Sequence, residues 1–374
     1  MSMLGIQFTL WAGENEPVPA SAMIMESLDS VEVTHSDEPH SGFQITFQAG
    51  RSGKADIKDY PLMSDSSLKP CNRVIMIVTF NARPHVLMDG IITTHELSPG
   101  SDPGATTLKV TGEDISLMMD REEKAAEHPC QDEAAIAKKI ISSYAKYGIN
   151  PDVKDPPVSD SPTQNERVPM QQGTDLEHLK ALADRYAYVF YVIPGPTPKT
   201  STAYWGPPKR NDMAQTALSV GMGPEACVDS VSFQNNSLAA TQVKGMVQDR
   251  ATNKSQPVQN NPPTQPSLSS QPSLQTQTCI RQKILRGQDG LGTSQAAAMA
   301  QAATDSSVNT VSVQGELDTL RYGDLLQARG IVEVKGAGFS YDGKYYVKKV
   351  THLIRRGSYK QRFTLTRDGL GSTK

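Results

Sequence analysis

The sequence predicts a mainly β protein: two tandem, related antiparallel β-barrels with a small α+β domain inserted between them. Short runs with period-2 alternation occupy both ends of the chain, and two helical patterns occupy the middle. Elements of the first part also recur in the same order in the last part, which indicates an internal repeat. With 374 residues, 37% of them hydrophobic and 6% aromatic, the chain suits several small cores better than one large core.

Strand patterns fill residues 1–115, which we predict to be the first barrel. The expected strands are residues 25–33, 42–47, 73–80 and 106–111. Between the last two, Asp89-Gly90 separates two β runs, and this dipeptide favours the type I′ turn of a hairpin.

Helical patterns begin in the middle, and residues 116–216 are predicted to be the α+β domain with two helices. Residues 131–147 have helical periodicity, and Gly148 suits the C-cap. A second helix extends to Tyr186, and its start has a capping box of Thr174 and Glu177. Strands are expected at residues 188–193 and 203–205.

The second barrel is expected to be discontinuous, formed by residues 217–252 and 307–374. Residues 253–306 between them are predicted to be a polar flexible excursion followed by a short helix at 294–304. The excursion consists mostly of Gln, Pro, Ser, Asn and Thr, which bury too little apolar surface to offset the entropy of ordering. We therefore expect residues 256–276 to be poorly ordered or extended, and shortening them to leave folding intact.

The repeat is carried by matched motifs in the two predicted barrels. The segment Leu28-Asp29-Ser30-Val31 resembles Val228-Asp229-Ser230-Val231. Each is followed by an Asp-Gly pair, at 89–90 and at 342–343, and then by a Thr-His pair. The shared order predicts that His95 and His352 occupy equivalent strand positions, with a packing or hydrogen-bonding role rather than a metal-binding or acid-base role.

Composition argues against several classes of protein. The formal net charge of -3 lacks the basic excess of a nucleic-acid binder. The four cysteines are scattered singly, without zinc-ligand spacing or a disulfide framework, which is typical of reduced cysteines in a protein made in the cytoplasm. The N-terminus lacks the pattern of a signal peptide, and no segment approaches the roughly 18 apolar residues of a membrane span.

No motif predicts a catalytic, cofactor or metal site. His35, Ser36, Asp37 and His40 lie in the segment THSDEPHSG, which we interpret as a solvated hairpin loop rich in turn formers. Residues 287–292 read GxxGxG rather than GxGxxG and lack the Lys-Ser/Thr of a phosphate loop, so they are predicted to be a helix entry without a ligand. The HELSP segment at His95 lacks the second histidine of a zinc protease.

The C-terminal part is basic. Its cationic residues are Lys335, Lys344, Lys348, Lys349, Arg355, Arg356, Lys360, Arg362 and Arg367. Two interpretations stay open: a solvated strand face, or a surface that contacts an acidic protein partner.

Two segments resemble a known family. Residues 167–192, RVPMQQGTDLEHLKALADRYAYVFYV, resemble the "Q…-D-x-x-x-L-x-x-L-A-x-x-x-x-Y-x-F-x-V" segment of the phage late control D family. The same segment occurs in the hub half of type-six secretion valine-glycine-repeat spike proteins. Residues 320–369 are similar to the closing barrel of these proteins, with "G-x-Y-x-V-x-x-V-x-H" and a final Arg-flanked strand.

The resemblance implies a non-enzymatic baseplate hub made in the bacterial cytoplasm and working in a phage tail or contractile injection particle. Such a hub is a homotrimer whose two tube-type barrels per chain form a ring of six. The implied partners are the inner tube protein above, a separate spike protein below and other baseplate proteins. The alternatives are a secreted β-rich glycan-binding or glycan-hydrolysing protein, which would need paired carboxylates, and another baseplate or tube-initiator component.

Overall fold

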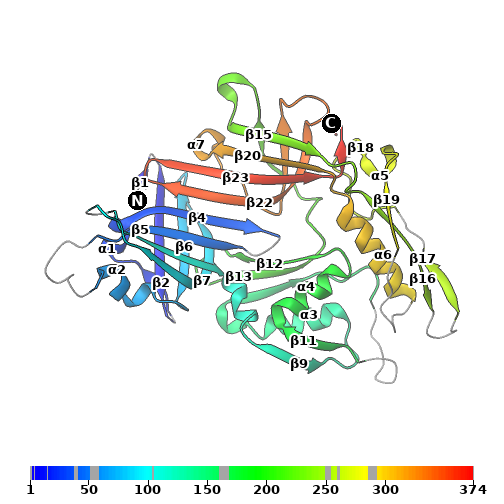
Figure 1. Ribbon diagram of the computed structural model, residues 1–374, viewed down its shortest axis with the longest axis horizontal. Coiled ribbons are helices and arrows are strands. Elements are labelled where there is room, and N and C mark those ends of the chain that lie inside the picture. The colour runs from blue at the N-terminus through cyan, green and yellow to red at the C-terminus, as the bar shows by residue number, and fades with distance from the viewer. Residues whose placement is uncertain are drawn as a thin grey trace.

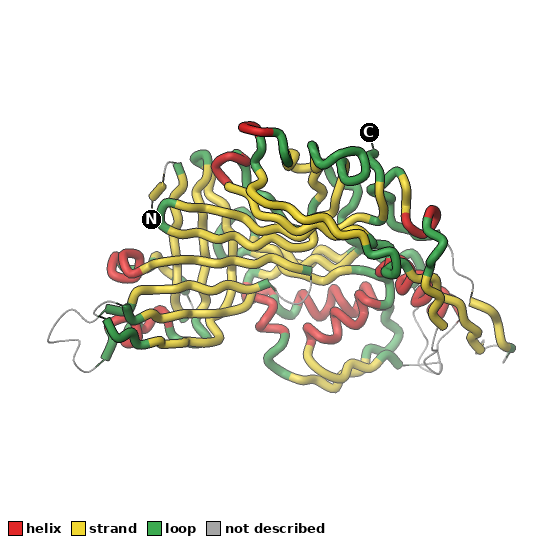
Figure 2. Tube along the Cα trace, turned by 45° about the horizontal axis from the view of Figure 1, so that its top comes forward, coloured by secondary structure: helices red, strands yellow, loops and turns green. Residues whose placement is uncertain are grey.

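The protein is built around one large, mainly antiparallel sheet with a smaller α+β unit beneath it (Figure 1). The computed structural model describes residues 2–3, 5–14, 16–37, 41–50, 59–102, 105–159, 168–248, 254–258, 262–284 and 293–373. The main sheet has 14 strands, in the order β1-β2-β6-β7-β8-β5-β4-β22-β23-β20-β15, with β3, β14 and β21 attached beside this path. Figure 2 shows these strands running continuously across the molecule. The predicted fold class is confirmed.

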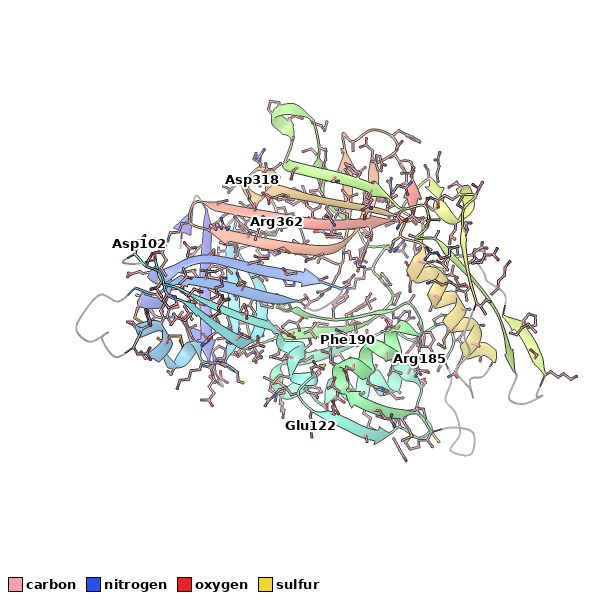
Figure 3. The ribbon with its side chains drawn as sticks, in the orientation of Figure 1. Asp102, Glu122, Arg185, Phe190, Asp318 and Arg362 are labelled. Atoms are coloured by element: carbon pink, nitrogen blue, oxygen red, sulfur yellow. The ribbon has the colours of Figure 1, made fainter. Side chains whose placement is uncertain are left out.

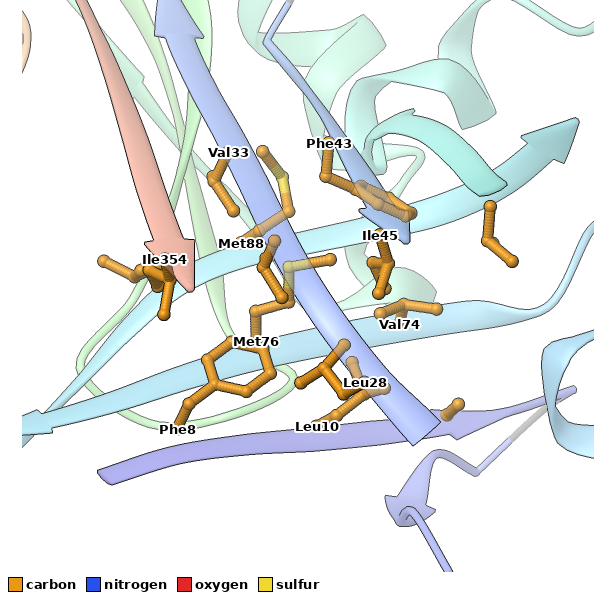
Figure 4. Close-up of a cluster of buried hydrophobic side chains, with 14 of the residues drawn as sticks. Phe8, Leu10, Leu28, Val33, Phe43, Ile45, Val74, Met76, Met88 and Ile354 are labelled. Atoms are coloured by element: carbon orange, nitrogen blue, oxygen red, sulfur yellow. The ribbon is translucent and has the colours of Figure 1, made fainter. Parts of the chain in front are cut away.

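The first unit supplies one end of the sheet. Its strands are β1 (Ser2–Met3), β2 (Ile6–Gly13), β3 (Val18–Pro19), β4 (Leu28–Ser36), β5 (Gly42–Gln48), β6 (Arg73–Phe80), β7 (Arg83–Ser98) and β8 (Thr107–Asp114). Its helices are α1 (Ala22–Ser27), α2 (Pro61–Ser64) and the 3₁₀ turn η2 (Ser66–Leu68). Alternate side chains point inward, so Phe8, Leu10, Val33 and Ile45 meet in one core (Figure 4). Ile354, from a strand near the C-terminus, completes that core.

The predicted hairpin at Asp89-Gly90 is wrong, because both residues lie inside the continuous strand β7. The turn is formed instead by Asn81 and Ala82, whose φ angles of 49° and 61° match a type I′ turn. Asp89 is buried and accepts two 2.7 Å hydrogen bonds from Arg73. Burial raises the pKa of Asp89, and the hydrogen bonds and charge of Arg73 act in the opposite direction. A Cβ at Gly90 would collide with the backbone oxygen of Glu113 on β8. The dipeptide thus serves a buried ion pair and a close strand contact.

A second difference lies just before β4. The strand predicted over residues 25–33 begins only at Leu28, since residues 25–27 belong to helix α1. The side chain of Ser21 caps that helix by accepting a hydrogen bond from the Ile24 amide.

The middle unit has the predicted α+β form. It contains η3 (Ile115–Met119), β9 (Glu123–Glu127), α3 (Glu133–Ser142), η4 (Ala145–Tyr147), β10 (Ile149–Val153), β11 (Met170–Thr174), α4 (Asp175–Asp184), β12 (Val189–Pro194) and β13 (Ser201–Gly206). Gly148 ends the first helical region with φ 81°, and the capping box of Thr174 and Glu177 is present. Phe190, labelled in Figure 3, is buried with Trp205 in the core of this unit.

The second unit supplies the other end of the sheet. Its elements are β14 (Ala214–Ser219), η5 (Gly223–Glu225), β15 (Val228–Asn235), β20 (Val311–Asp318), α7 (Thr319–Tyr322), β21 (Ile331–Lys335), β22 (Gly343–Arg355), β23 (Ser358–Arg367) and β24 (Gly369–Leu370). Its path β21-β22-β23-β20-β15 repeats the path β6-β7-β8-β5-β4 of the first unit, in the same chain order and with every pair antiparallel. The sixth strands differ, since β2 is antiparallel to β6 but β14 is parallel to β21.

A β-bulge fixes how the two units align. Pairing skips Asp29 between Leu28 and Ser30 on β4, and it skips Asp229 at the same place on β15. The repeated motif therefore encodes the same irregularity twice.

The histidine prediction holds only in part. His95 and His352 do lie on the equivalent strands β7 and β22. The two bulges give a common starting point from which equivalent residues can be followed from strand to strand through the pairing. By this alignment, His95 is equivalent to Val350, and His352 is equivalent to Leu97. The histidines are thus two residues out of register.

An arm extends from the second unit between β15 and β20. It contains β16 (Thr241–Gln248), β17 (Ser255–Val258), β18 (Gln271–Pro272), α5 (Ser273–Thr276), β19 (Arg281–Ile284) and α6 (Thr293–Ser307), and α6 packs against β16. Within the predicted polar excursion, Leu268 is only 3% exposed and packs with Ile331 and Tyr346. Asp368 accepts a 2.9 Å hydrogen bond from the Leu268 amide. Part of this polar stretch is therefore held against the second unit, while the predicted boundaries 253–306 stay a prediction.

Candidate functional site

The seam where the two units meet combines strand pairing with a cluster of buried polar contacts. Here β4 pairs antiparallel with the C-terminal half of β22, from Lys349 opposite Ser36 to Arg355 opposite Ser30. On one face, the hydroxyl groups of Thr34 and Thr351 are hydrogen-bonded at 2.9 Å. On the other face, Val33 and Ile354 belong to the core of the first unit and Val350 belongs to the core of the second.

A buried ion pair closes one end of the seam. The side chains of Asp37 and Arg329 are 6% and 4% exposed, and Arg329 Nε donates to Asp37 Oδ1 over 3.1 Å. Arg329 Nη2 also donates to the carbonyl oxygen of Ser36 and to the hydroxyl oxygen of Ser41. The guanidinium thus ties the end of β4 to the loop before β21, in a place where an unpaired charge would cost several kcal/mol.

Two tyrosines complete this cluster. The Tyr346 hydroxyl donates to Asp37 Oδ2 over 2.8 Å, and the Arg329 guanidinium lies 4.0 Å from the ring centre of Tyr191. Burial raises the pKa of Asp37, against the opposing effects of Arg329 and Tyr346. Because Tyr191 belongs to β12, the cluster joins all three units.

These contacts correct the interpretation of THSDEPHSG as a solvated loop. His35 and Ser36 belong to β4, and Asp37 is buried against Arg329, while His40 lies outside the described residues. The period-2 alternation of Val31 and Val33 continues inward to His35, and this was the signal in the sequence that could have placed it in the seam.

Two histidines face each other across the seam. The rings of His35 and His352 meet edge to face with centres 5.8 Å apart. Nδ1 of His352 is 2.9 Å from the Tyr359 hydroxyl. Burial lowers the pKa of His352 to about 4 and holds the pKa of His35 well below its ordinary value, so both rings are neutral at pH 7.

A cavity of about 440 Å³ opens beside these histidines. It is lined by β7, by the Pro-Gly-Pro that ends β12 and by residues 325–329 of the second unit. Its polar lining consists of the histidines His35, His85 and His352, the arginines Arg83 and Arg329, and the amide of Gln327. Among the described residues that line it there is no carboxylate, thiol or hydroxyl side chain, so its histidines have no side-chain nucleophile in the lining to activate.

A second polar network stabilises the middle unit. Asp175 accepts hydrogen bonds of 2.6 to 2.7 Å from Gln171, Lys124 and Tyr144. Burial acts to raise the pKa of Asp175, but these donors outweigh it and leave the pKa below its ordinary value. Nearby, the rings of His128 and His178 are stacked with centres 5.9 Å apart. Burial lowers the pKa of His178 to about 4. Sequence reasoning did not anticipate this network.

The remaining predicted features are spread over the molecule. His95 lies on β7, and the glycine-rich residues 287–292 fall outside the described residues. Throughout the described part of the chain, no cluster of three or more His, Cys, Asp or Glu side chains could hold a metal ion. All four cysteines are free. In the described helices, none is long and apolar enough to cross a membrane.

Seven of the nine basic C-terminal residues fall into three groups, while Lys335 pairs with Glu333 and Lys348 is half-buried. Arg367 is buried, where it donates to three backbone oxygens. Lys360 and Arg362 on β23 pair with Glu316 on β20. Figure 3 shows Arg362 on its strand, with Asp318 at the end of the neighbouring one. Lys344, Lys349, Arg355 and Arg356 are exposed, and for them both interpretations remain open.

Comparison with known proteins identifies the fold. No family model matches the sequence, and no curated protein matches it. Among solved structures, a tail protein of Neisseria meningitidis superposes with a TM-score of 0.66 at 12% identity, covering 99% of this chain and 100% of that one. A 43 kDa prophage tail protein of Shewanella oneidensis also gives a TM-score of 0.66, at 13% identity over 98% and 99% of the two chains.

A third similar structure comes from a secretion machine. It is an E. coli component of the type VI secretion system, itself described as structurally similar to the T4 bacteriophage tail proteins gp27 and gp5. The TM-score is 0.52 at 12% identity, over 91% of this chain and 73% of that one. The resemblance predicted from the sequence is therefore confirmed at the level of the fold.

Proposed function

We propose that this chain, which has the fold of phage tail and type VI secretion proteins, is the structural hub of a contractile tail or injection-system baseplate. Three copies form a ring that adapts the hexameric inner tube above to a trimeric spike below. Other baseplate proteins contact its outer surface. The protein is made in the bacterial cytoplasm, works in the assembled particle and has no catalytic turnover.

The observation that carries the proposal is the repeated strand path of the two units. A chain with two similar units presents six similar surfaces when three copies surround an axis, while the whole assembly keeps threefold symmetry. That combination suits a protein placed between a sixfold and a threefold partner. The seam supports it, because a continuous sheet and a buried ion pair hold the two units in a fixed relation.

The proposed lack of catalysis is supported by the chemistry of the polar clusters at the seam and in the middle unit. His352 is buried and His35 is half-buried, both rings are neutral, and Asp37 and Asp175 each accept hydrogen bonds from at least two side chains. Asp37 and the seam histidines lie where the units meet, and Asp175 stabilises the middle unit. A glycan hydrolase would instead need two carboxylates facing a sugar-sized groove.

The test is to measure mass in solution by light scattering and then to image the particle with and without its cognate spike and tube proteins. We expect three times the 40.6 kDa chain mass and a ring of six similar units around a threefold axis. A stable monomer that binds neither spike nor tube at micromolar concentration would overturn the proposal. Binding to tube but not to spike would favour a tube-initiator component instead.

A further inference from the structure

Strand β22 pairs with two different strands along one of its edges. Its N-terminal residues, Gly343 to Tyr346, pair with β21 of its own unit. From Lys349 to Arg355 the same edge pairs with β4 of the first unit. The opposite edge of β22 pairs with β23 along nearly its whole length. One half of the strand thus belongs to its unit and the other half makes the seam.

The equivalent strand β7 has the same division, but none of the described strands pairs with its second half on that edge. Arg83 to Ile91 pair with β6, and Ile92 is hydrogen-bonded to residues 71 and 72. Beyond Ile92, the described strands offer residues 93–98 a partner only on the β8 side.

Strand β15 is open in the complementary way. It is the equivalent of β4, which pairs with β5 on one side and with β22 on the other. Of the described strands, only β20 pairs with β15. Strand β15 is therefore the last strand of the sheet, at the top of Figure 1. The molecule therefore exposes both halves of a second seam, one at each end. Exposed strand edges of this kind are templates for pairing with another chain.

We propose that β15 of one chain pairs antiparallel with residues 93–98 of β7 in a second copy, and that this contact repeats the internal seam of β4 and β22. The residue equivalences counted from the two bulges predict the register of this contact. Glu96 is equivalent to Thr351 and Gln234 to Thr34, so the internal pair Thr351–Thr34 predicts that Glu96 lies opposite Gln234 of the partner subunit. His352 opposite Val33 becomes Leu97 opposite Phe233 of the partner subunit.

The burial of the apolar residues on β15 agrees with this register. In the internal seam Val31 and Val33 are 2% and 0% exposed. Their equivalents Val231 and Phe233 are only half-buried, at the margin of the second core. Leu97 is likewise half-buried at the margin of the first core. The proposed pairing brings Leu97 and Phe233 of two chains together and removes both from water, which is favourable by the usual hydrophobic term.

Polar groups at the two edges are also compatible with the pairing. The Nε2 atom of His95 is buried and has no hydrogen-bond partner among the described residues. The register places Asn235 of the partner subunit opposite His95, and its amide can both donate and accept. On the other face, Glu96 and Gln234 are exposed and can approach each other without a buried charge.

The contact is head-to-tail, because each chain contributes β15 at one end and β7 at the other. A heterologous contact of this kind forms a ring if its rotation closes. That the ring closes at three chains rests on the proposed function above. The pairing of β15 with β7 does not depend on the number of chains.

The test uses cysteine pairs in a chain whose exposed Cys71, Cys130 and Cys279 are changed to Ser. In the Glu96→Cys/Gln234→Cys variant, oxidation should link chains into species that separate only under reducing conditions. The matched control Thr34→Cys/Thr351→Cys places the same geometry within one chain and should form a disulfide without any increase in mass. A shifted pair, Glu96→Cys/Ser230→Cys, lies about 13 Å out of register and should not cross-link.

A charge series at the exposed Gln234 gives a second readout that leaves the cores intact. Gln234→Glu would face Glu96 of the partner subunit and should weaken assembly about twofold to fivefold, whereas Gln234→Lys should strengthen it by a similar factor. Sedimentation over a concentration series measures both variants. Equal assembly of the two variants contradicts the pairing.

The outcomes distinguish this contact from the hub proposal. A trimer in which the 96–234 pair does not cross-link, while the control pair does, overturns the edge pairing and leaves the hub standing. Cross-linked chains that form open ladders rather than closed trimers support the edge pairing and overturn the trimeric hub. A monomer that neither assembles nor cross-links overturns both.

Discussion

Replacing Arg329 by Met should destabilise the protein more than any single surface change. The substitution leaves Asp37 buried with one remaining side-chain donor, the Tyr346 hydroxyl, and it removes the bonds to Ser36 and Ser41. Breaking a buried ion pair by removing one partner costs about 3 to 5 kcal/mol, because an uncompensated charge stays behind. The Arg329→Met/Asp37→Asn double variant should recover part of that loss, since the amide is neutral.

Urea unfolding followed by tryptophan fluorescence measures this effect. Trp11 lies in the first unit and Trp205 in the middle unit, so single-tryptophan backgrounds report each unit separately. With a slope of about 3 kcal/mol per molar urea, the midpoint should fall by on the order of 1 M. As the control, Lys154→Met removes an ion pair with Asp152 whose side chains are 51% and 34% exposed, and it should cost at most about 0.5 kcal/mol. Equal midpoints for Arg329→Met and Lys154→Met would refute the reasoning.

Two further perturbations test the seam and the close packing of β20 against its neighbouring strands. His352 has a pKa of about 4 in the folded protein and an ordinary pKa of 6.5, so on acidification the unfolded chain is protonated at this residue before the folded chain is. The contribution of neutral His352 to the free energy of unfolding should be fully present above pH 6.5. It should be lost, by up to about 3 kcal/mol, as the pH drops through 4. His352→Gln should flatten that part of the pH dependence in thermal unfolding, and parallel curves for variant and wild type would contradict it. Gly315→Ala would put a Cβ 2.5 Å from Phe363 and 2.6 Å from the Ser230 oxygen, so we expect a loss of about 1 to 3 kcal/mol. Gly50→Ala has nothing within 4 Å and should be near neutral; a loss at Gly50 equal to that at Gly315 would argue against a packing cause.

Local patterns in the sequence predicted most of the elements. Alternation located the strands because one face of each is buried, and the capping box located α4 because Thr174 and Glu177 satisfy amides that a helix start leaves free. The duplication was visible because similar residues surround the bulges at Asp29 and Asp229. These signals all act within a few residues of one another.

The seam could not be predicted in the same way. Its partners are far apart in the chain, as with Asp37 and Arg329, and no local pattern links them. Asp89-Gly90 shows the converse problem: the same dipeptide serves a turn or a buried ion pair with a close strand contact, and only the fold decides between them. The two-residue offset between His95 and His352 could not be predicted, because the Thr-His motif alone does not reveal the strand register that separates the two positions.

The apolar contribution of Ile354 to the first core has a consequence for synthesis on the ribosome. The strands of the first unit are complete once Asp114 has emerged, but its core stays open on the β4 side until β22 is made. At ordinary translation rates, the interval between residues 114 and 354 lasts on the order of 10 to 50 s. Throughout that time the nascent chain displays an unpaired strand beside exposed apolar side chains. Crowded polysomes would favour pairing of that strand with a neighbouring nascent copy, so we expect the yield of folded protein to depend on chaperones that bind during translation.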